Sequence, residues 1–354
     1  MIAESKPHSE ALAPEDIPNP FAEEEAMENR GEVCQKPFRI LFLGGAKRVS
    51  IGRMFLSAAA RLGFRGELYS YELDREVPLA EIAEILPGLR WSDPALMDDL
   101  RRVCDNRGID IVVPFVDPAV EIAAKLDGFR RSDNGVVRAA THTDPAEVAR
   151  IFDKVEANAL FLAAKLPVPK DYPMRGAFFP MIAKPRFGSA SQGIMILHRP
   201  TELADIPNQE DYLIQEYVAK REEYTVDCYV RRDDGTILCA VPRRRLVVVG
   251  GEVSSTVTFR DKEVEDLARK TLAQTGLRGP VTVQMLRDTT DGRLMLMEIN
   301  PRLGGGAVCT VHAGADLPLM ILSDLLGLRP GICDDWQGNV KICRYMQEVV
   351  FRKL

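Results

Sequence analysis

The stretch LMLMEINPRLGGG, residues 294–306, runs from an apolar strand into an acid, an amide, a guanidinium and three glycines. Buried polar groups cost free energy unless they are paired, so a core strand has no need of Glu298, Asn300 and Arg302 at its end. A phosphate site with metal ions uses all three, because Mg²⁺ takes oxygen ligands and arginine binds phosphoryl oxygens in a bidentate way. The glycines allow backbone to approach a ligand closely.

The segment VTVQMLRD (281–288) predicts a partner strand, joined to RLMLMEIN (293–300) by TTDG. A three-residue loop with a left-handed Gly292 places Gln284 opposite Glu298. Side chains two apart on a strand share a face, so Gln284, Glu298 and Asn300 are expected to converge. Three oxygen ligands with one charge are typical of Mg²⁺, which fills its octahedron with water and phosphate. The alternative is a polar strand end followed by a glycine turn.

A second glycine cluster lies in FPMIAKPRFGSASQGIMIL, residues 179–197. It has the glycine spacing of a P-loop, but Ile-Met follows where Lys and Ser/Thr are required, and strands flank it on both sides. The pattern favours a hairpin whose loop folds over a polyphosphate, with Lys184 beneath it; an ordinary flexible hairpin is the alternative. The loop residues expected to contact phosphate are Gly188, Ser189, Ser191 and Gly193.

The segment YLIQEYVAKREEYTVDCYV (212–230) predicts two strands joined by a short linker. Such a linker offers backbone N–H and C=O groups to an adenine edge, and an acid beyond it can bind ribose hydroxyls. Solvated surface acids explain the same pattern.

The first third of the chain alternates strands and helices, which predicts an α/β, doubly wound parallel sheet. The expected strands are 38–45, 66–73 and 109–116, and the expected helices are 52–63, 94–108 and 117–129. The glycines in LGGAKRVSIGR (43–53) indicate either a tight strand-to-helix turn or an anion site, but GxGxxG is absent. Glu72 and Asp74 end a strand as a ribose-binding acid does, so a dehydrogenase is a third alternative.

The remaining two thirds predict an α+β unit rich in antiparallel hairpins. The expected elements are a helix over 147–165, strand pairs 180–185 with 193–198 and 211–218 with 223–231, a strand over 236–249, a helix over 261–275, the hairpin 280–287 with 293–300, and a helix over 315–327.

Composition limits the classes of function. The net charge is −6, and residues 1–36 hold nine acids and three bases, so that segment is expected to be a disordered tail. The rest of the chain is close to neutral, which does not indicate a nucleic-acid surface. No apolar run has the length of a membrane span, and the seven scattered cysteines are typical of reduced thiols in the cytoplasm.

In the motifs within residues 179–197, 212–230 and 281–306, the chain resembles the ATP-grasp superfamily, and within it the carbamoyl-phosphate-synthase-like branch. The resemblance covers about residues 38–327. The resemblance implies a Rossmann-like pre-ATP-grasp domain over 37–145 and a two-lobed ATP-grasp domain over 146–354. The lid-bearing lobe is expected at about 177–212 and the C-terminal catalytic lobe at about 213–354. The triple glycine resembles stand-alone ligases of this branch, and Lys220 departs from a common glycine.

The resemblance also implies roles for single residues. Lys154 and Lys184 match the phosphate-binding bases, and the loop 188–193 matches the lid. Arg302 matches the arginine that stabilises the phosphoryl group. Glu216, Val218 and Glu223 match the adenine and ribose positions, while Gln284, Glu298 and Asn300 match the metal ligands, with Glu298 expected to bridge two ions.

The implied function is that of an ATP-dependent carboxylate–amine ligase that forms an amide through an acyl-phosphate and releases ADP. ATP and two Mg²⁺ ions are the expected cofactors, with Mn²⁺ as an alternative metal, and the partners are a small carboxylic acid and an amine. On a strand leading to the same cleft, Arg243 and Arg245 are expected to face the acid; a solvated basic edge strand is the alternative. The competing functions are a phosphotransferase without the amine step and a non-catalytic ATP sensor. A homodimer is one option for the assembly.

Overall fold

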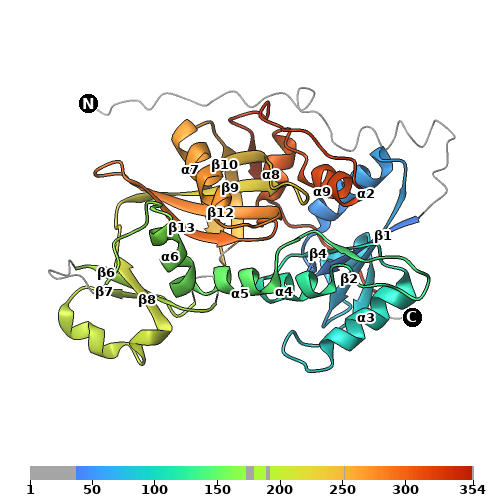
Figure 1. The fold of residues 1–354 in the computed structure, drawn as a ribbon, viewed down its shortest axis with the longest axis horizontal. Coiled ribbons are helices and arrows are strands. Elements are labelled where there is room, and N and C mark those ends of the chain that lie inside the picture. The colour runs from blue at the N-terminus through green and yellow to red at the C-terminus, as the bar shows by residue number, and fades with distance from the viewer. Residues whose placement is uncertain (1–36, 173–178, 189–191, 251, 353–354) are drawn as a thin grey trace.

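The computed structural model describes residues 37–172, 179–188, 192–250 and 252–352. The acidic segment 1–36 and the loop residues Ser189 and Ser191 therefore lie outside the described residues. Figure 1 shows an elongated molecule in which three sheets follow one another along the long axis.

The sheet nearest the N-terminus is five-stranded, parallel, and ordered β3-β2-β1-β4-β5. Its strands are β1 (Pro37–Leu43), β2 (Arg65–Glu72), β3 (Glu84–Pro87), β4 (Ile111–Pro114) and β5 (Arg138–Ala139). The connecting helices are α2 (Val49–Arg61), η2 (Pro78–Glu81), α3 (Leu96–Arg107) and α4 (Asp117–Leu126). The predicted α/β parallel sheet is confirmed, and β3 and β5 are short strands that the sequence pattern did not reveal.

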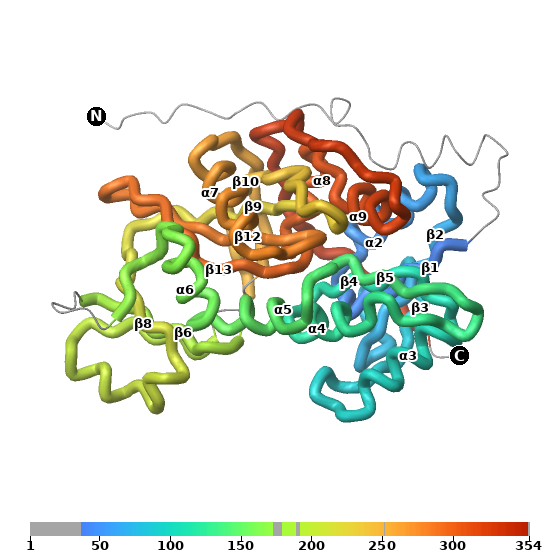
Figure 2. Tube along the Cα trace, viewed as in Figure 1, coloured from blue at the N-terminus to red at the C-terminus, as the bar shows by residue number. Residues whose placement is uncertain are grey.

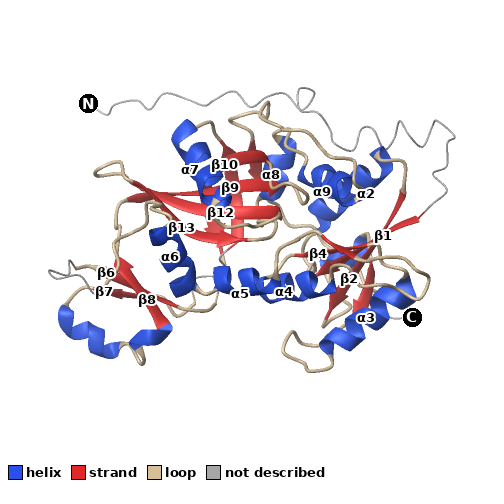
Figure 3. Ribbon diagram, viewed as in Figure 1, coloured by secondary structure: helices blue, strands red, loops and turns tan. Residues whose placement is uncertain are grey.

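The central sheet is six-stranded and antiparallel, in the order β13-β12-β9-β10-β11-β14. Its strands are β9 (Arg221–Val230), β10 (Ile237–Val249), β11 (Glu252–Thr258), β12 (Gly279–Asp288), β13 (Leu294–Asn300) and β14 (Lys341–Cys343). Helices α7 (Lys262–Ala273), α8 (Ala307–His312) and α9 (Leu317–Leu325) accompany this sheet, as Figure 3 shows.

A small three-stranded sheet, ordered β7-β6-β8, lies apart from the other two in Figure 3. Its elements are β6 (Met181–Pro185), β7 (Met195–Leu197), η3 (Pro200–Asp205), η4 (Gln209–Asp211) and β8 (Tyr212–Glu216). The predicted pairing of 211–218 with 223–231 is wrong. β8 pairs with β6, whereas β9 pairs with β10 and β12, so residues 217–220 cross from one sheet to the other.

The single helix expected over 147–165 is also wrong, because it divides into α5 (Pro145–Phe152) and α6 (Lys154–Ala163). The residue between them, Asp153, is extended, and its carboxylate accepts hydrogen bonds from the N–H groups of Val155 and Glu156. This N-cap satisfies two of the donors that a helix start leaves unpaired. The division makes Lys154 the first residue of α6.

The parallel and antiparallel sheets share one hydrophobic core. Residues of β1 such as Ile40 and Phe42 belong to the same buried cluster as Tyr229 of β9, Leu238 of β10 and Ile321 of α9. Helix α2 lies against α9, as the tube in Figure 2 also shows, although more than 250 residues of chain separate them. The small sheet has its own cluster around Met181, Ala183 and Ile214.

Within the described ranges, no helix has the length and apolar character to cross a membrane. The six cysteines in those ranges are all free thiols.

Candidate active site

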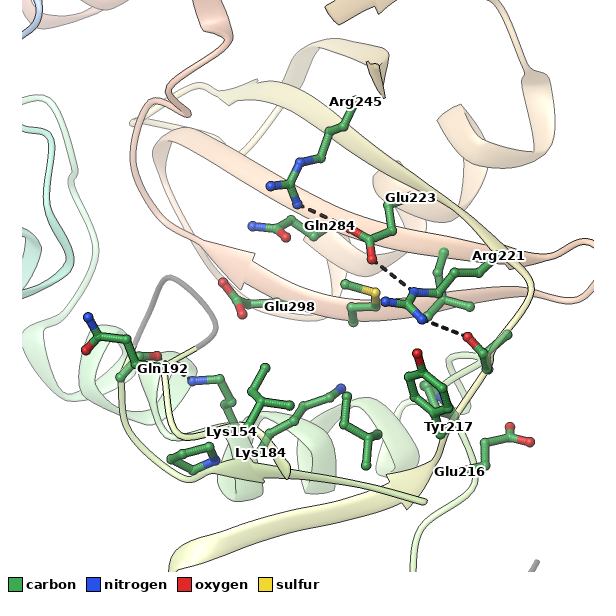
Figure 4. A pocket seen from close by; sticks show the side chains of 18 of the residues that line it. Lys154, Lys184, Gln192, Glu216, Tyr217, Arg221, Glu223, Arg245, Gln284 and Glu298 are labelled. Atoms are coloured by element: carbon green, nitrogen blue, oxygen red, sulfur yellow. Dashed lines mark hydrogen bonds and ion pairs between the residues drawn. The ribbon is translucent and has the colours of Figure 1, made fainter. Parts of the chain in front are cut away.

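A pocket lies between the small sheet and the central sheet. Figure 4 shows Lys154 of α6 and Lys184 of β6 on one side and Gln284 of β12 and Glu298 of β13 facing them. The linker residues Tyr217 and Val218 complete one end. The structure therefore brings predicted phosphate-binding and metal-binding residues to opposite walls of one pocket, which we call the lysine pocket.

Lys184 is held by a neutral partner. Its Nζ donates a 3.0 Å hydrogen bond to Oε1 of Gln215, which is buried. The Gln215 amide is fixed in turn, because its Nε2 donates to Asn158, to the Pro169 carbonyl and to Asp171. Desolvation lowers the pKa of Lys184 to about 8, and the nearby Glu298 carboxylate opposes that shift. Gln215 was not identified as a site residue from sequence.

Lys154 reaches the glycine loop. Its backbone N–H donates to the Arg186 carbonyl at 3.0 Å, and its Nζ donates to the Gly188 carbonyl at 2.6 Å. Gly188 has a φ of +115°, a conformation that favours glycine. The helix break at Asp153 and the start of the loop thus meet, and Arg186 strengthens the contact by donating to the Asp153 carboxylate at 2.6 Å.

The hairpin β12–β13 carries the candidate metal ligands. Gln284 pairs with Glu298, as the sequence predicted, and Thr282 pairs with Asn300. The turn, however, is one residue longer than expected, because Asp288 N–H bonds the Arg293 carbonyl and Arg287 pairs with Leu294. A β-bulge at Met297, between the Gln284 and Met285 pairs, restores the predicted register.

The bulge also decides which face carries Glu298. Leu294, Leu296 and Ile299 belong to the buried core beneath the central sheet. Strict alternation would have placed Glu298 on the face of Leu294 and Leu296. Because the bulge inserts Met297, both Met297 and Glu298 line the lysine pocket.

Gln284, Glu298 and Asn300 present a donor set that suits Mg²⁺. Asn300, which is 2% exposed, donates from Nδ2 to Glu298 Oε1 at 2.7 Å, so its Oδ1 remains as an acceptor. In the described ranges, no group of three or more His, Cys, Asp or Glu side chains has metal-site geometry. One carboxylate with two amide oxygens fits an ion that takes its remaining ligands from a nucleotide and water.

Apolar side chains form one wall of the lysine pocket. Val218, Leu286 and Met295 are buried together, and Met297 packs against them. Ile182 of β6 and Ile194, which directly precedes β7, also line the pocket. Stacked apolar walls beside the linker backbone are suited to a flat heterocycle, which places the predicted adenine residue Val218 in an appropriate setting.

The two acids predicted at the adenine and ribose positions, Glu216 and Glu223, are already bound to other groups of the chain. Glu216 receives hydrogen bonds from Arg293 Nη1 at 2.8 Å and from the N–H of Lys170 at 3.0 Å, and Figure 4 shows its carboxylate turned away from the lysines. Glu223 accepts from Arg221 Nε at 2.9 Å and from Arg245 Nη1 at 3.3 Å. Arg221, a lining residue that sequence reasoning missed, also donates to the Val218 carbonyl.

A second pocket lies on the other side of Glu298, and we call it the arginine pocket. Arg245, Gln284 and Glu298 line both pockets. The arginine pocket adds Arg48 and Asp117 from the parallel-sheet unit, together with Asn300, Arg302 and the glycine turn 304–306. Arg302 is bound to Asp117 at 2.6 Å, so the start of α4 holds its guanidinium in place.

Arg243 is the most buried of these arginines. It is 1% exposed and binds both oxygens of Asp227, through Nε at 2.5 Å and through Nη2 at 3.1 Å. A Cβ at Gly306 would collide with this guanidinium, so the glycine there allows backbone to approach Arg243. Arg244, between Arg243 and Arg245 on β10, lies over the ring of Phe259.

Two further sequence features lie outside these pockets. The Glu72 carboxyl accepts hydrogen bonds from the N–H groups of Gly45 and Ala46, so the first glycine loop and the acid bind each other. Desolvation raises the pKa of that carboxyl. His312 ends α8 and is not among the residues that line either pocket.

Comparison with known proteins agrees with this architecture. Residues 208–347 match the model of a family described as ATP-grasp in the biosynthetic pathway with Ter operon. The chain has the ATP-grasp fold. The predicted resemblance to the ATP-grasp superfamily is thereby confirmed. No curated protein sequence matches the chain.

Solved structures extend the likeness beyond that segment. The biotin carboxylase domain of Hydrogenobacter thermophilus 2-oxoglutarate carboxylase, in complex with MgADP, ADP and bicarbonate, superposes with a TM-score of 0.67 at 15% identity over 86% of this chain and 73% of its own. N5-carboxyaminoimidazole ribonucleotide synthetase from Thermotoga maritima gives 0.58 at 16%, over 82% and 76%. Rhizobium etli pyruvate carboxylase gives 0.64 at 17%, over 82% of this chain but only 30% of its own.

Proposed function

We propose that this protein is an ATP-dependent carboxylate–amine ligase that activates its acid as an acyl-phosphate and releases ADP and phosphate. The observation that carries the proposal is the position of Glu298. This carboxylate borders both the lysine pocket and the arginine pocket, so a γ-phosphate and an acid can meet at one group.

In this proposal the lysine pocket binds ATP. Adenine lies against Val218, Leu286 and Met297, and the linker backbone offers hydrogen-bond partners to its edge. Lys154 and Lys184 contact the phosphates. Within the described residues, their Nζ atoms donate hydrogen bonds to neutral groups, the Gly188 carbonyl and the Gln215 amide oxygen, so neither is bonded to a carboxylate there. Gly188 and Gly193 are proposed to contact the phosphates; Ser189 and Ser191, which lie outside the described residues, remain predicted contacts.

Gln284, Glu298 and Asn300 would hold Mg²⁺, with two ions expected and Mn²⁺ as an alternative. When bound, these ions neutralise charge on the transferring phosphoryl group. The chain itself contributes positioning: Asn300 orients Glu298 through its 2.7 Å hydrogen bond, and Asp117 fixes Arg302 beside the same site. Positioning of two reactants can lower a barrier by about 7–11 kcal/mol.

The acid is proposed to bind on the arginine-pocket side, with Arg302 and Arg245 facing its carboxylate. A carboxylate oxygen attacks the γ-phosphorus, the bond to the β–γ bridging oxygen breaks, and ADP leaves. A neutral amine then attacks the acyl carbon, inorganic phosphate departs, and the amine proton is lost to water. Exclusion of water from the site protects the acyl-phosphate from hydrolysis.

The test is a screen of acids, each with and without amines, that measures phosphate release from Mg-ATP. The expected result is ADP formation that needs an acid and couples to amide formation when the amine is present. Lys184→Ala and Glu298→Gln are expected to abolish most of this activity. Lys262→Ala is the matched control, because this α7 lysine is 87% exposed.

Several results would contradict the proposal. AMP as the product would indicate an acyl-adenylate, and ADP formation that ignores the amine would indicate a phosphotransferase. ATP binding with no turnover across the screen would indicate a sensor. Full activity in both Lys184→Ala and Glu298→Gln would show that the catalytic site lies elsewhere.

A further inference from the structure

Three arginines from distant parts of the chain meet over the glycine turn. Arg48 precedes α2, Arg302 follows β13, and Arg344 follows β14. A Cβ at Gly305 would lie 3.5 Å from Arg48 Nη1 and 3.8 Å from Arg344 Nη2. Arg344 also donates to the carbonyl of Gly305, a residue that lines the arginine pocket, so its guanidinium lies beside that pocket.

These arginines are only partly compensated by acids. Arg302 has Asp117 to itself, but Arg48 and Arg344 share Glu252, at 3.5 Å and 3.0 Å. The neighbouring Arg243 and Arg245 are bound to Asp227 and Glu223. Among the described residues, Glu252 is the only carboxylate paired with either Arg48 or Arg344, so these two guanidiniums share one negative charge.

The charges also repel one another. Arg48 has a side chain 17% exposed, and desolvation lowers its pKa, with Arg344 and Arg302 adding to the shift. Helix α2 follows Arg48 directly and has no acid in its first turn, although a helix start favours negative charge. Like charges held together cost free energy unless an anion neutralises them.

We propose that the arginine pocket selects an acid with a second anionic group, which binds Arg48 and Arg344 while the reacting carboxylate lies at Arg302 and Glu298. This inference rests on the proposed ligase function and names the class of its acid substrate. A dicarboxylate and a phosphorylated carboxylic acid share the required chemistry. Arg48 and Arg344 are specificity residues, since they bind the non-reacting end of the acid.

The test compares acids that differ in the second charge. Phosphate release from Mg-ATP is measured with pentanoate against glutarate and with glycerate against 3-phosphoglycerate, which separates a dicarboxylate from a phosphorylated acid. Calorimetric titration of the same four compounds measures binding without turnover. The acid with two anionic groups, here called the dianion whatever its total charge, is expected in at least one pair to bind about tenfold or more tightly than its partner, because hydrogen bonds between charged groups are strong.

Variants separate a specificity role from a structural one. Arg48→Gln and Arg344→Gln are each expected to weaken the preferred dianion about tenfold and to leave its monoanionic partner and ATP unchanged. Glu252→Gln is expected to tighten dianion binding, because it frees both guanidiniums; a merely structural cluster would show no gain. Arg53→Gln is the matched control, since this arginine lies on α2 and pairs with Glu81.

The outcomes distinguish the inference from the function on which it rests. Equal affinity for both members of each pair, or dianion binding unaffected by Arg48→Gln and Arg344→Gln, overturns the inference even if an acid-dependent ligase activity is found. Arginine-dependent dianion binding with no phosphate release for any acid supports the anion site and contradicts the ligase.

Discussion

The lysine pocket and the arginine pocket meet at Glu298 but hold their cations in different ways. Lys154 and Lys184 bond to a backbone carbonyl and a neutral amide. Arg243, Arg245 and Arg302 each bond to a carboxylate. A lysine without a counter-charge gains most when an anion arrives, whereas an arginine fixed by a carboxylate is already oriented. We infer that the two lysines neutralise the charge of an incoming anion, whereas these three arginines orient it.

The largest effect is expected at the shared group. Glu298→Gln should lower the rate of ADP formation by about 10³-fold, equivalent to about 4 kcal/mol, because it removes the charged metal ligand between the two pockets. Titration of ATP without metal should be unchanged. Glu263→Gln is the control, since that carboxylate pairs with Arg287, is 63% exposed and lines neither pocket. Comparable losses in both variants would contradict a special role for Glu298.

The next effect tests whether Arg243 is fixed by its acid. Asp227→Ala should destabilise the fold by about 3–5 kcal/mol, because it leaves a buried guanidinium without its partner. Asp117→Ala should cost about 1 kcal/mol or less, since Arg302 and Asp117 are 18% and 21% exposed. Urea unfolding measures both. A stable Asp227→Ala protein that loses only turnover would instead make Arg243 a catalytic group, as the sequence predicted.

A pH effect should be confined to the lysine pocket. Lys184 has a pKa lowered to about 8, so above that pH it is neutral in the free protein and must take up a proton when phosphate binds. The dissociation constant of MgATP should therefore rise by up to about tenfold per pH unit above pH 8. Arginine stays protonated, so Lys184→Arg should abolish this dependence in calorimetric titrations. A wild-type affinity that is constant from pH 7 to 9 would contradict the assignment.

The smallest effect concerns the apolar wall. Val218→Ala should weaken ATP binding several-fold and cost about 1 kcal/mol of stability, because it removes buried methyl groups from a small cluster. Val253→Ala, in the arginine pocket, should leave ATP affinity unchanged. If Val253→Ala weakened ATP as much as Val218→Ala, the two pockets would not be separate binding sites.

The hairpin shows how a sequence prediction can be correct for an incomplete reason. Gln284 does pair with Glu298, but the turn is one residue longer than predicted and the bulge at Met297 compensates. Neither feature follows from alternation of apolar residues, because Met297 simply continues the apolar run of residues 294–296. A bulge depends on how a strand fits its partner and the core below it.

The linker shows the opposite case. Two apolar segments separated by a few residues predicted a hairpin over 211–231, but β8 and β9 belong to different sheets. Local sequence signals a strand, whereas its partner depends on side chains far along the chain.

At the helix break, by contrast, the sequence did contain a signal. Asp153 and Glu156 have the spacing of a capping box, which would have predicted the break and the position of Lys154.

The sequence by itself determined the parallel sheet, the polar groups at the end of β13 and the resemblance to ATP-grasp proteins, because periodicity and motif spacing are local properties of a chain. Only the tertiary structure decided that Gln215 orients Lys184, that Asp227 holds Arg243, and that Arg48, Arg302 and Arg344 converge. These contacts join residues from different elements, and their geometry depends on how the sheets pack around a shared core rather than on any single segment.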